Sequence, residues 1–419
     1  MQRLSRFRWY FLGLLIVAFA IRVAAGGWWQ RGMGEGHRFR FYDSESYWNH
    51  AQTIVCGEPY QDGAGWRVFR TPGYPALLAG WFWLAGDDDP PVIWARVLSA
   101  LLGTLAVGAV VWLAWMLFDP RTALIAGLLA AFYPGAIALS VFVLAEAPFC
   151  LWMILQLVLW TLAWRADDAK RRIGFSLTGG ILAGAATLCR PSWLLFTPFA
   201  IFIGLLVVEQ KKKQLVIGAT MIGGLCLAML PWWIRNYQVA GRFVPTTLQV
   251  GASLYDGLNP DATGASNMDF VPKFYDEQKR SDRQADVQPH GLFEERLDRR
   301  LRNASIDWAR ENPGQVVRLM GVKFLRIWNV LPNAGELQSW KVRLVVMLGY
   351  TPLIVLGIWG AWKFGRDGWP YVLCYLPAIY VTCLHMVFVG SIRYRQPVML
   401  AMIVLAAGVL NSIWKQEKN

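Results

Sequence analysis

The sequence predicts an all-α polytopic membrane protein, a bundle of about 10–12 transmembrane helices with juxtamembrane helices and loops on its outer side. Two observations lead to this fold class. Of the 419 residues, 55% are hydrophobic and only 16% are charged, whereas a soluble domain of this length needs more charge to cover its surface. Apolar runs long enough to cross a bilayer also recur through most of the chain, so we expect residues 1–419 to form one integral membrane domain.

The first apolar run follows the basic stretch MQRLSRFR and ends in small residues, a pattern that signal peptides share. Arg22 interrupts the run near its end, and further spans follow, so we expect a retained first helix. The apolar runs together predict ten spans, at about residues 9–27, 92–117, 121–140, 141–164, 173–190, 191–208, 214–234, 342–362, 370–390 and 396–414.

Two shorter apolar stretches, 73–86 and 316–331, are ambiguous. If both crossed the membrane, the basic runs KRR (170–172) and KKK (211–213) would face outside, against the positive-inside rule. We therefore expect both stretches to lie at the outer interface or to re-enter from it. Both termini are then cytoplasmic, and two long hydrophilic loops face outside, at about residues 28–91 and 235–341.

The net charge of +13 does not indicate nucleic-acid binding, because the basic residues gather at the ends of apolar segments. Five of the six cysteines lie in or beside apolar segments, and Cys56 alone lies in a predicted loop, so no disulfide framework is expected. Four scattered histidines and the absence of a CxxC motif give no zinc signature.

Unusual polar residues fall in the outer loops or near the outer ends of the predicted spans. Ionisable groups in or beside a bilayer are costly and usually mark function, although a single arginine there can extend its side chain to water. Acidic residues opposite arginines suggest a base beside an anion site, because guanidinium groups bind phosphate well. These residues are Asp43, Glu45, Arg67, Arg70, Glu146, Arg190, Arg235, Asn236, Arg393 and Arg395. For Glu146, which lies within an apolar run, a structural pairing and a catalytic role remain equally open.

The order of several motifs resembles the GT-C membrane glycosyltransferases, in particular bacterial members similar to aminoarabinose transferase and protein O-mannosyltransferase. No single motif is specific, but their shared order covers nearly the whole chain. The motifs are DSESY (43–47) with Ala51 and GEPY (57–60), RTPGYP (70–75), ARVLSALLGTL (95–105), FYPGAIALSVFVLAEAPF (132–149), LCRPSWLLFTP (188–198), PWWIRNYQVAG (231–241), GLNPDATG (257–264) and RYRQP (393–397).

The resemblance implies transfer of a sugar from a polyprenyl-phosphate carrier to a lipid, glycan or protein acceptor, with inversion, at the outer face of the inner membrane. Asp43 matches the acidic residue of the family and is expected to be the general base, with Glu45 as the alternative. The donor phosphate is expected to bind Arg70, Arg393 and Arg395, with Arg190 and Arg235 behind them. Further candidates for the site are Tyr47, Arg67, Glu146 and Asn236.

Two alternative functions stay open at the level of the sequence, together with the question of a metal. A transporter or flippase of a lipid-linked or anionic substrate also has many spans and buried charges, but is expected to show repeat symmetry and polar residues at mid-bilayer. A surface-polysaccharide ligase or polymerase uses the same carriers. No cofactor is required, although a divalent metal is possible at Asp43, Glu45, His37 and His50, whose spacing matches no zinc or calcium signature.

Overall fold

The computed structural model describes residues 2–34, 38–63, 65–285, 290–331 and 339–416. The expected all-α fold is confirmed: these residues form helices and loops, with one isolated antiparallel bridge between Asp62 and Trp66. The helices are α1 (Gln2–Arg31), α2 (Tyr42–Val55), α3 (Gly73–Ala85), α4 (Ile93–Leu117), α5 (Pro120–Phe132), α6 (Pro134–Val141), α7 (Glu146–Arg165), α8 (Ala169–Cys189), the 3-10 helix η1 (Pro191–Trp193), α9 (Phe196–Val207), α10 (Lys211–Ala240), α11 (Val250–Gly257), α12 (Val271–Gln284), α13 (Phe293–Glu311), α14 (Pro313–Trp328), α15 (Trp340–Phe364), α16 (Trp369–Val387) and α17 (Ile392–Gln416).

Eight helices in the described part of the chain are long and apolar enough to cross a membrane: α1, α4, α7, α8, α10, α15, α16 and α17. A ninth span is formed if α5 and α6 are counted as one broken helix. This count is below the ten spans predicted from the sequence. The difference lies in two segments, 121–140 and 191–208.

A proline breaks the segment expected at 121–140. Tyr133 ends α5 in an extended conformation, with ψ of 114°, and Pro134 begins α6, which is bent by 54° from α5. A residue before proline is displaced from the helical region by the ring of the proline, so one straight span is excluded here. The segment expected at 191–208 instead consists of η1 and the 12-residue α9.

The two stretches expected at the interface are indeed short helices. At 1.5 Å per residue, the 13 residues of α3 and the 16 of α14 extend about 20 and 24 Å, less than the roughly 30 Å of a hydrocarbon core. Their lengths agree with the prediction that neither one crosses the membrane.

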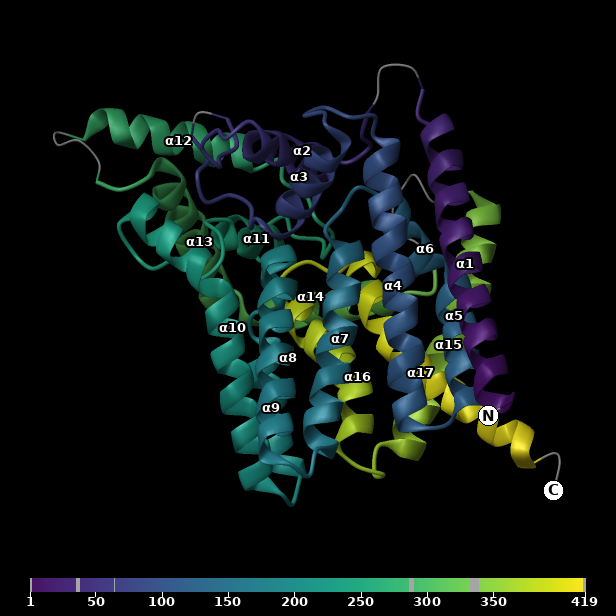
Figure 1. The fold of residues 1–419 in the computed structure, drawn as a ribbon. Coiled ribbons are helices and arrows are strands. Elements are labelled where there is room, and N and C mark those ends of the chain that lie inside the picture. The colour runs from purple at the N-terminus through teal and green to yellow at the C-terminus, as the bar shows by residue number, and fades with distance from the viewer. Residues whose placement is uncertain (1, 35–37, 64, 286–289, 332–338, 417–419) are drawn as a thin grey trace.

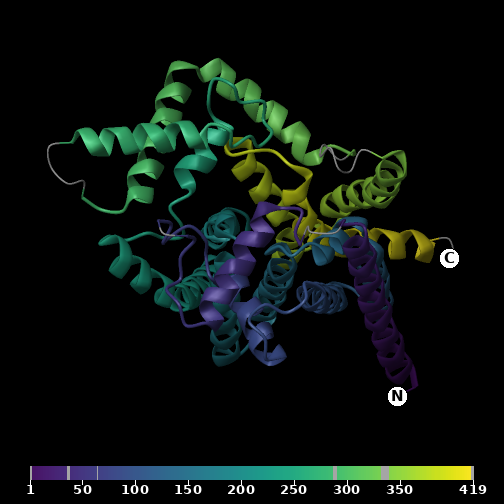
Figure 2. The same cartoon turned by 90° about the horizontal axis from the view of Figure 1, so that it is seen from above.

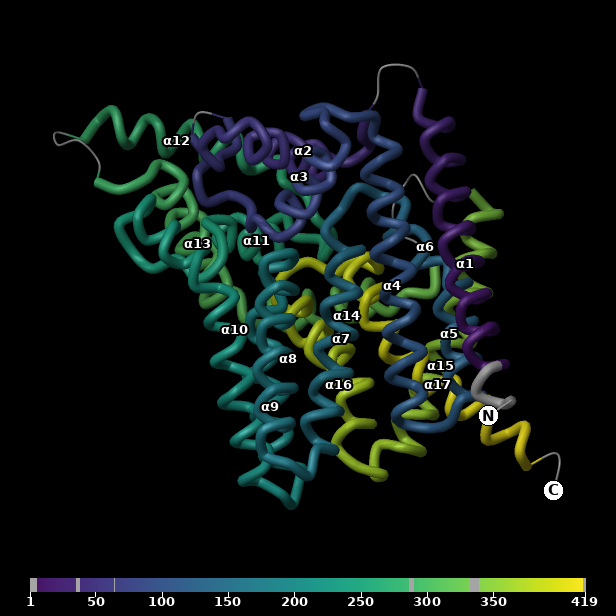
Figure 3. The backbone as a smooth tube through the Cα atoms, viewed as in Figure 1, coloured from purple at the N-terminus to yellow at the C-terminus, as the bar shows by residue number. Residues whose placement is uncertain are grey.

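Helices α2, α3 and α11–α13 of the two hydrophilic loops gather at one end of the bundle, α14 lies lower beside the long helices, and both chain termini lie at the other end (Figure 1). The tube in Figure 3 follows the same path, with α2, α3 and α11–α13 above the long helices. In the view from above, the second loop forms an arc along one side of α2 and α3 (Figure 2). The basic runs at the starts of α8 and α10 lie at the end of the termini, where the ammonium of Lys213 lies 5.2 Å from the centre of the Trp164 ring.

The long helices pack closely where small residues face each other. A Cβ atom on Gly180 of α8 would lie 2.0 Å from the carbonyl oxygen of Met221, and one on Gly224 of α10 would lie 2.2 Å from that of Leu177. Only glycine allows this approach, as is common between membrane helices. The last helix, α17, is buried over most of its length, so its first turn is held firmly at the loop-bearing end.

Candidate active site

The motif DSESY lies at the start of α2. There the partial positive charge of the helix N-terminus stabilises the carboxylates of Asp43 and Glu45. Successive residues of a helix are about 100° apart, so Asp43 and Glu45 point in different directions. Glu45 is exposed, whereas Asp43 is turned toward the protein, with 31% of its side chain exposed. The two carboxylates thus differ in exposure, and the choice of Asp43 over Glu45 as the base remains a prediction.

Asp43 lies between two arginines from distant parts of the chain. Arg70, in the loop before α3, donates to its Oδ1 at 2.6 Å, and Arg393, in the first turn of α17, donates to its Oδ2 at 3.1 Å. Burial raises the pKa of Asp43, but the charges and hydrogen bonds of the two arginines outweigh burial and lower this pKa to about 2. The carboxylate is thus ionised throughout the physiological range.

Glu146, the first residue of α7, joins the same group of charges from below. Its side chain is fully buried, and it pairs with Arg190 at 2.5 Å and with Arg393. Its Oε2 atom has no hydrogen-bond partner among the described residues. A buried carboxylate is stable as an ion only when it is paired, so the structural pairing that the sequence left open for Glu146 is present.

These five residues, which we call the charged cluster, are Asp43, Arg70, Glu146, Arg190 and Arg393. Three guanidinium groups face two carboxylates, which leaves a net charge of +1. Local sequence explains the placement of Arg190: it follows α8 in an extended conformation (ψ 104°) because Pro191 comes next. Each member comes from the end of a helix or the loop before one, at the loop-bearing end of the bundle.

Aromatic rings hold two of the arginines in place. The guanidinium carbon of Arg70 lies 5.2 Å from the centre of the Tyr47 ring and 4.9 Å from that of Phe69. That of Arg190 lies 5.4 Å from the ring of Tyr394. Such cation–π contacts restrict the planar group and keep its N–H donors directed at the carboxylates. Tyr47, a sequence-based candidate, thus contacts the cluster as a packing partner of Arg70.

Arg395 does not join the charged cluster. Its side chain is fully buried, donates to the backbone carbonyls of Ile327 and Asn329, and lies 3.6 Å from the centre of the Tyr350 ring. Arg393 and Arg395 are two positions apart in one helix, so they point to different sides. The expected pairing of both arginines on one phosphate does not agree with these contacts.

The remaining candidates lie where the two loops pack together. Arg235 donates to the carbonyl of Tyr60 at 2.6 Å, and Asn236 donates to the carbonyl of Val244 at 3.1 Å. The side chain of Arg67 is exposed, while its backbone N–H donates to Glu294 at 3.0 Å. These contacts join the last turns of α10 and the start of α13 to neighbouring loop segments, and the expected roles of the three residues in donor binding remain predictions.

Ser46 is a member of the site that the sequence did not single out. Its hydroxyl donates to Asp62 at 2.9 Å and accepts from Nε of Arg70 at 3.4 Å. It lies one helical turn from Asp43 within the same motif, and that spacing was the available signal.

No three His, Cys, Asp or Glu side chains in the described ranges are grouped as metal ligands. His37, one of the ligands considered from the sequence, lies outside the described residues. His50 is buried, with its Nδ1 2.7 Å from the carbonyl oxygen of Ser46.

The fold of this helical bundle is similar to that of solved membrane-protein structures. Two structures of the Archaeoglobus fulgidus oligosaccharyltransferase share this fold. The apo form is 17% identical, with a TM-score of 0.62 over 97% of this chain and 51% of that one. The form in complex with an inhibitory peptide and a dolichol-phosphate is 16% identical, with a TM-score of 0.61 over 98% of this chain and 51% of that one.

Sequence comparison agrees with the fold. Residues 81–244 match the dolichyl-phosphate-mannose-protein mannosyltransferase family. The undecaprenyl phosphate-alpha-4-amino-4-deoxy-L-arabinose arabinosyl transferase of Yersinia enterocolitica is 27% identical over 182 residues, which are 42% of this chain and 31% of that protein. The match thus covers about a third of the length of this relative. The resemblance to GT-C membrane glycosyltransferases is confirmed.

Proposed function

We propose that this protein is a glycosyltransferase that moves a sugar from a polyprenyl-phosphate-linked donor to a lipid, glycan or protein acceptor, with inversion at the anomeric carbon. The observation that carries the proposal is the placement of Asp43 between Arg70 and Arg393. A carboxylate and guanidinium groups at one site are the parts that this reaction needs: a base for the acceptor and cations for the phosphate.

In the proposed reaction, Asp43 takes the proton of an acceptor hydroxyl while the acceptor oxygen forms a bond to the anomeric carbon. The bond between that carbon and the phosphate oxygen breaks, and polyprenyl phosphate leaves with the electron pair. The phosphate gains one negative charge in this step, and the guanidinium groups of Arg70 and Arg393 stabilise it. Attack opposite the leaving group gives inversion.

The net charge of the cluster supports binding of an anion. Three arginines share two carboxylates, so one guanidinium charge is unbalanced until a phosphate arrives. Arg393 contacts both Asp43 and Glu146 and is therefore the central donor to the phosphate. Arg190 lies behind it on Glu146. Arg395, held by backbone carbonyls, is proposed to fix the start of α17 instead of contacting the phosphate.

Donor binding also prepares Asp43 as a base. With a pKa of about 2, this carboxylate is a weak proton acceptor while both arginines bind it. A phosphate that takes over donors of Arg70 and Arg393 removes the interactions that lower the pKa, so the basicity of Asp43 rises when the donor is bound.

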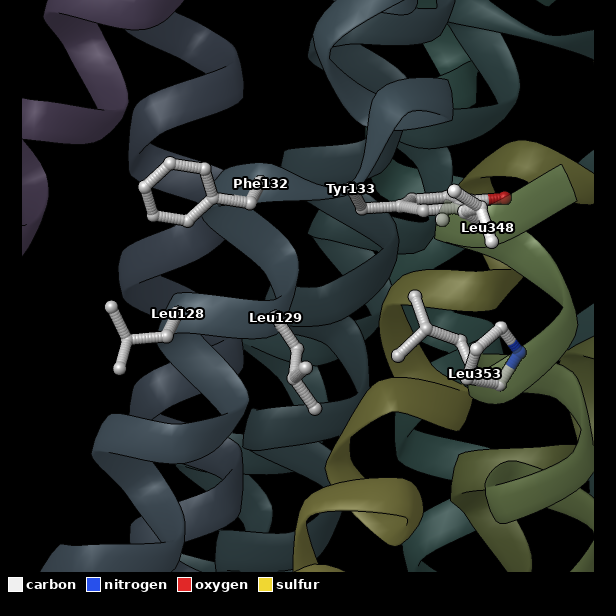
Figure 4. A pocket seen from close by; sticks show the side chains of 8 residues that line it. Leu128, Leu129, Phe132, Tyr133, Leu348 and Leu353 are labelled. Carbon is white, nitrogen blue, oxygen red and sulfur yellow. The ribbon is translucent and has the colours of Figure 1, made fainter. Parts of the chain in front are cut away.

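A groove between α5 and α15 is proposed to hold the isoprenoid chain of the donor. It encloses about 310 Å³, and the side chains around it are almost all apolar (Figure 4). Those labelled in Figure 4 are Leu128, Leu129, Phe132 and Tyr133 from α5 and its end, and Leu348 and Leu353 from α15.

One residue that lines this groove, Tyr133, is hydrogen-bonded to the helix that carries Arg393. The hydroxyl of Tyr133 donates to Gln396, which follows Arg393 by three residues, or about one turn of α17. An isoprenoid chain in the groove would therefore have its phosphate end toward Arg393. This continuity favours the donor chain as the occupant.

The cluster is proposed to face the outside of the inner membrane. The basic runs lie at the opposite end of the bundle, with the termini, and basic residues favour the cytoplasmic side. The acceptor is then proposed to approach from the outside, through the two loops that cover the cluster.

Mass spectrometry of envelope glycans in a strain that lacks this protein tests the proposal and identifies the sugar and its acceptor. We expect one sugar substituent to be missing, and to return with the wild-type protein but not with Asp43→Asn. Full complementation by Asp43→Asn would contradict the proposed reaction. A transporter would instead move an intact lipid-linked sugar across liposomes without releasing polyprenyl phosphate.

A further inference from the structure

Glu294 is a buried acid that the reaction described above does not use. It is the second residue of α13, in the second outer loop, and its side chain is fully buried. Its carboxylate accepts hydrogen bonds from two consecutive backbone N–H groups of the first outer loop. Oε1 accepts from Arg67 at 3.0 Å and from Val68 at 2.9 Å, and Oε2 accepts from Val68 at 3.2 Å.

The bonded segment is the one that leads to the charged cluster. Arg70 is two residues beyond Val68, and its guanidinium donates to Asp43 at 2.6 Å. On the other side of the segment, the carbonyl of Val68 accepts from the N–H of Leu248 at 2.9 Å. The N–H and the carbonyl of Val68 are thus both bonded to residues of the second loop, and these bonds fix the backbone before Arg70.

Ring contacts hold the same two loops together beside Glu294. The ring of Trp66 lies 6.4 Å from that of Tyr275 in α12, at an interplanar angle of 27°. The ring of Tyr275 in turn lies 4.9 Å from that of Phe293 in α13. These rings already supply packing. The charge-assisted hydrogen bonds from two N–H groups to Glu294 add direction, which packing alone lacks.

We infer that Glu294 is a positioning residue: its carboxylate holds the backbone at Arg67 and Val68, and so directs Arg70 at Asp43 and at the donor phosphate. The inference rests on the proposed function for the role of Arg70. It adds a link between the second outer loop and the reacting groups, because movement of α13 would displace Arg70. It also makes this link dependent on pH near neutrality.

The dependence on pH follows from the surroundings of Glu294. Burial raises its pKa to about 7, although the N–H groups of Val68 and Arg67 and the charges of Arg235 and Arg67 oppose this rise. On α13 itself, Glu295 is paired with Arg242 at 2.6 Å, and Asp298 accepts from the N–H of Gly251 at 2.6 Å.

Ionised Glu294 accepts bonds at both oxygens, whereas protonation turns one oxygen into a donor that faces an N–H group. The link is therefore strong above a pH of about 7 and weaker below it.

Glu294→Gln is the variant that tests this inference, because an amide keeps the size of the side chain and one acceptor but cannot ionise. We expect kcat/KM for the donor, per folded enzyme, to fall by about 10- to 100-fold, the cost of a small misplacement of a binding group. The variant also loses any rise of kcat/KM near pH 7. Glu295→Gln is the matched control, since Glu295 is adjacent on α13 but pairs with Arg242; its kcat/KM should equal that of the wild type.

Hydrogen–deuterium exchange of the peptide that contains Arg67 and Val68 provides a readout that does not require turnover. In the wild-type protein, protection of these amides, corrected for intrinsic exchange, should increase as the pH rises through 7. In Glu294→Gln it should be lower and constant. If Glu294→Gln keeps both the wild-type kcat/KM and the wild-type protection, the inference is wrong. If the wild-type protein uses no lipid-linked donor, the proposed function fails while the exchange result still decides whether Glu294 holds this segment.

Discussion

Replacement of Asp43 by asparagine separates a catalytic role from a structural one. The pKa of Asp43 is about 2 where the ordinary value is 3.8, and one pKa unit corresponds to about 1.4 kcal/mol. The interactions of the ionised carboxylate, net of the cost of its burial, therefore contribute about 2.5 kcal/mol of stability. Because this pKa is lowered, the contribution is complete above pH 3.8 and is lost as the pH falls through 2. The variant Asp43→Asn lacks this contribution to stability at every pH above about 2.

A loss of this size leaves most domains folded, since their stability is about 5–15 kcal/mol. The transfer rate should fall much further, by about 10²–10⁴-fold, the range of general acid–base catalysis. The assay is turnover per folded enzyme with a polyprenyl-phosphate-linked sugar, with folding checked by size-exclusion chromatography in detergent. Glu45→Gln is the control, because Glu45 is exposed, and it should keep near-normal turnover. A folded Asp43→Asn protein with full turnover would refute the assignment of Asp43 as the base.

Three further predictions concern the anion site, the topology and the groove. Arg393→Lys keeps the charge but loses the planar guanidinium group, so kcat/KM for the donor should fall by about 10- to 100-fold. Arg395→Lys should instead lower the thermal midpoint of unfolding more than it lowers kcat/KM for the donor. Equal donor kinetics for Arg393→Lys and the wild type would remove Arg393 from the anion site. A membrane-impermeant thiol reagent added outside cells should label Cys56, which is exposed, but not a cysteine replacing Lys212; the reverse pattern would invert the topology. Leu129→Trp fills the groove. If two methylene groups of the donor chain are no longer buried, at about 0.8 kcal/mol each, KM for a long-chain donor should rise roughly tenfold and KM for a short-chain donor should not change. An equal change for both chain lengths would exclude the groove as the binding site of the chain.

The helices that cross the membrane were predictable because their signal is local. Long apolar runs and basic flanks gave the bounds of α4, α7 and α10 within six residues. Hydrophobicity alone did not show that the segment at 121–140 is bent. Pro134 lies in the middle of that run, and its effect on Tyr133 bends the chain by 54°.

The sequence predicted that the residues of the charged cluster lie near the same side of the membrane, but it did not predict which of them contact each other. The sequence placed Asp43, Glu146 and Arg393 near one face, yet Asp43 and Arg393 are 350 residues apart, and no local pattern selects one partner over another. The sequence also treated Arg393 and Arg395 alike. Their different directions follow from helical geometry once the start of α17 is known.

Glu294 escaped notice because its surroundings in the sequence are highly charged. The stretch FEERLDRRLR reads as the solvated face of a helix. Its burial depends on the backbone of Arg67 and Val68, more than 220 residues earlier. Buried acids of this kind become visible only when long-range packing is known.

Release of polyprenyl phosphate by the purified protein tests the central claim most directly. Protein reconstituted in liposomes would be given a polyprenyl-phosphate-linked sugar and the acceptor fraction of the native membrane, and both products would be quantified by mass spectrometry. The account predicts polyprenyl phosphate and glycosylated acceptor in equal amounts with the wild-type protein, and a rate at least 10²-fold lower with Asp43→Asn. Passage of intact donor across the liposome membrane without release of polyprenyl phosphate, or equal release by both proteins, would contradict it.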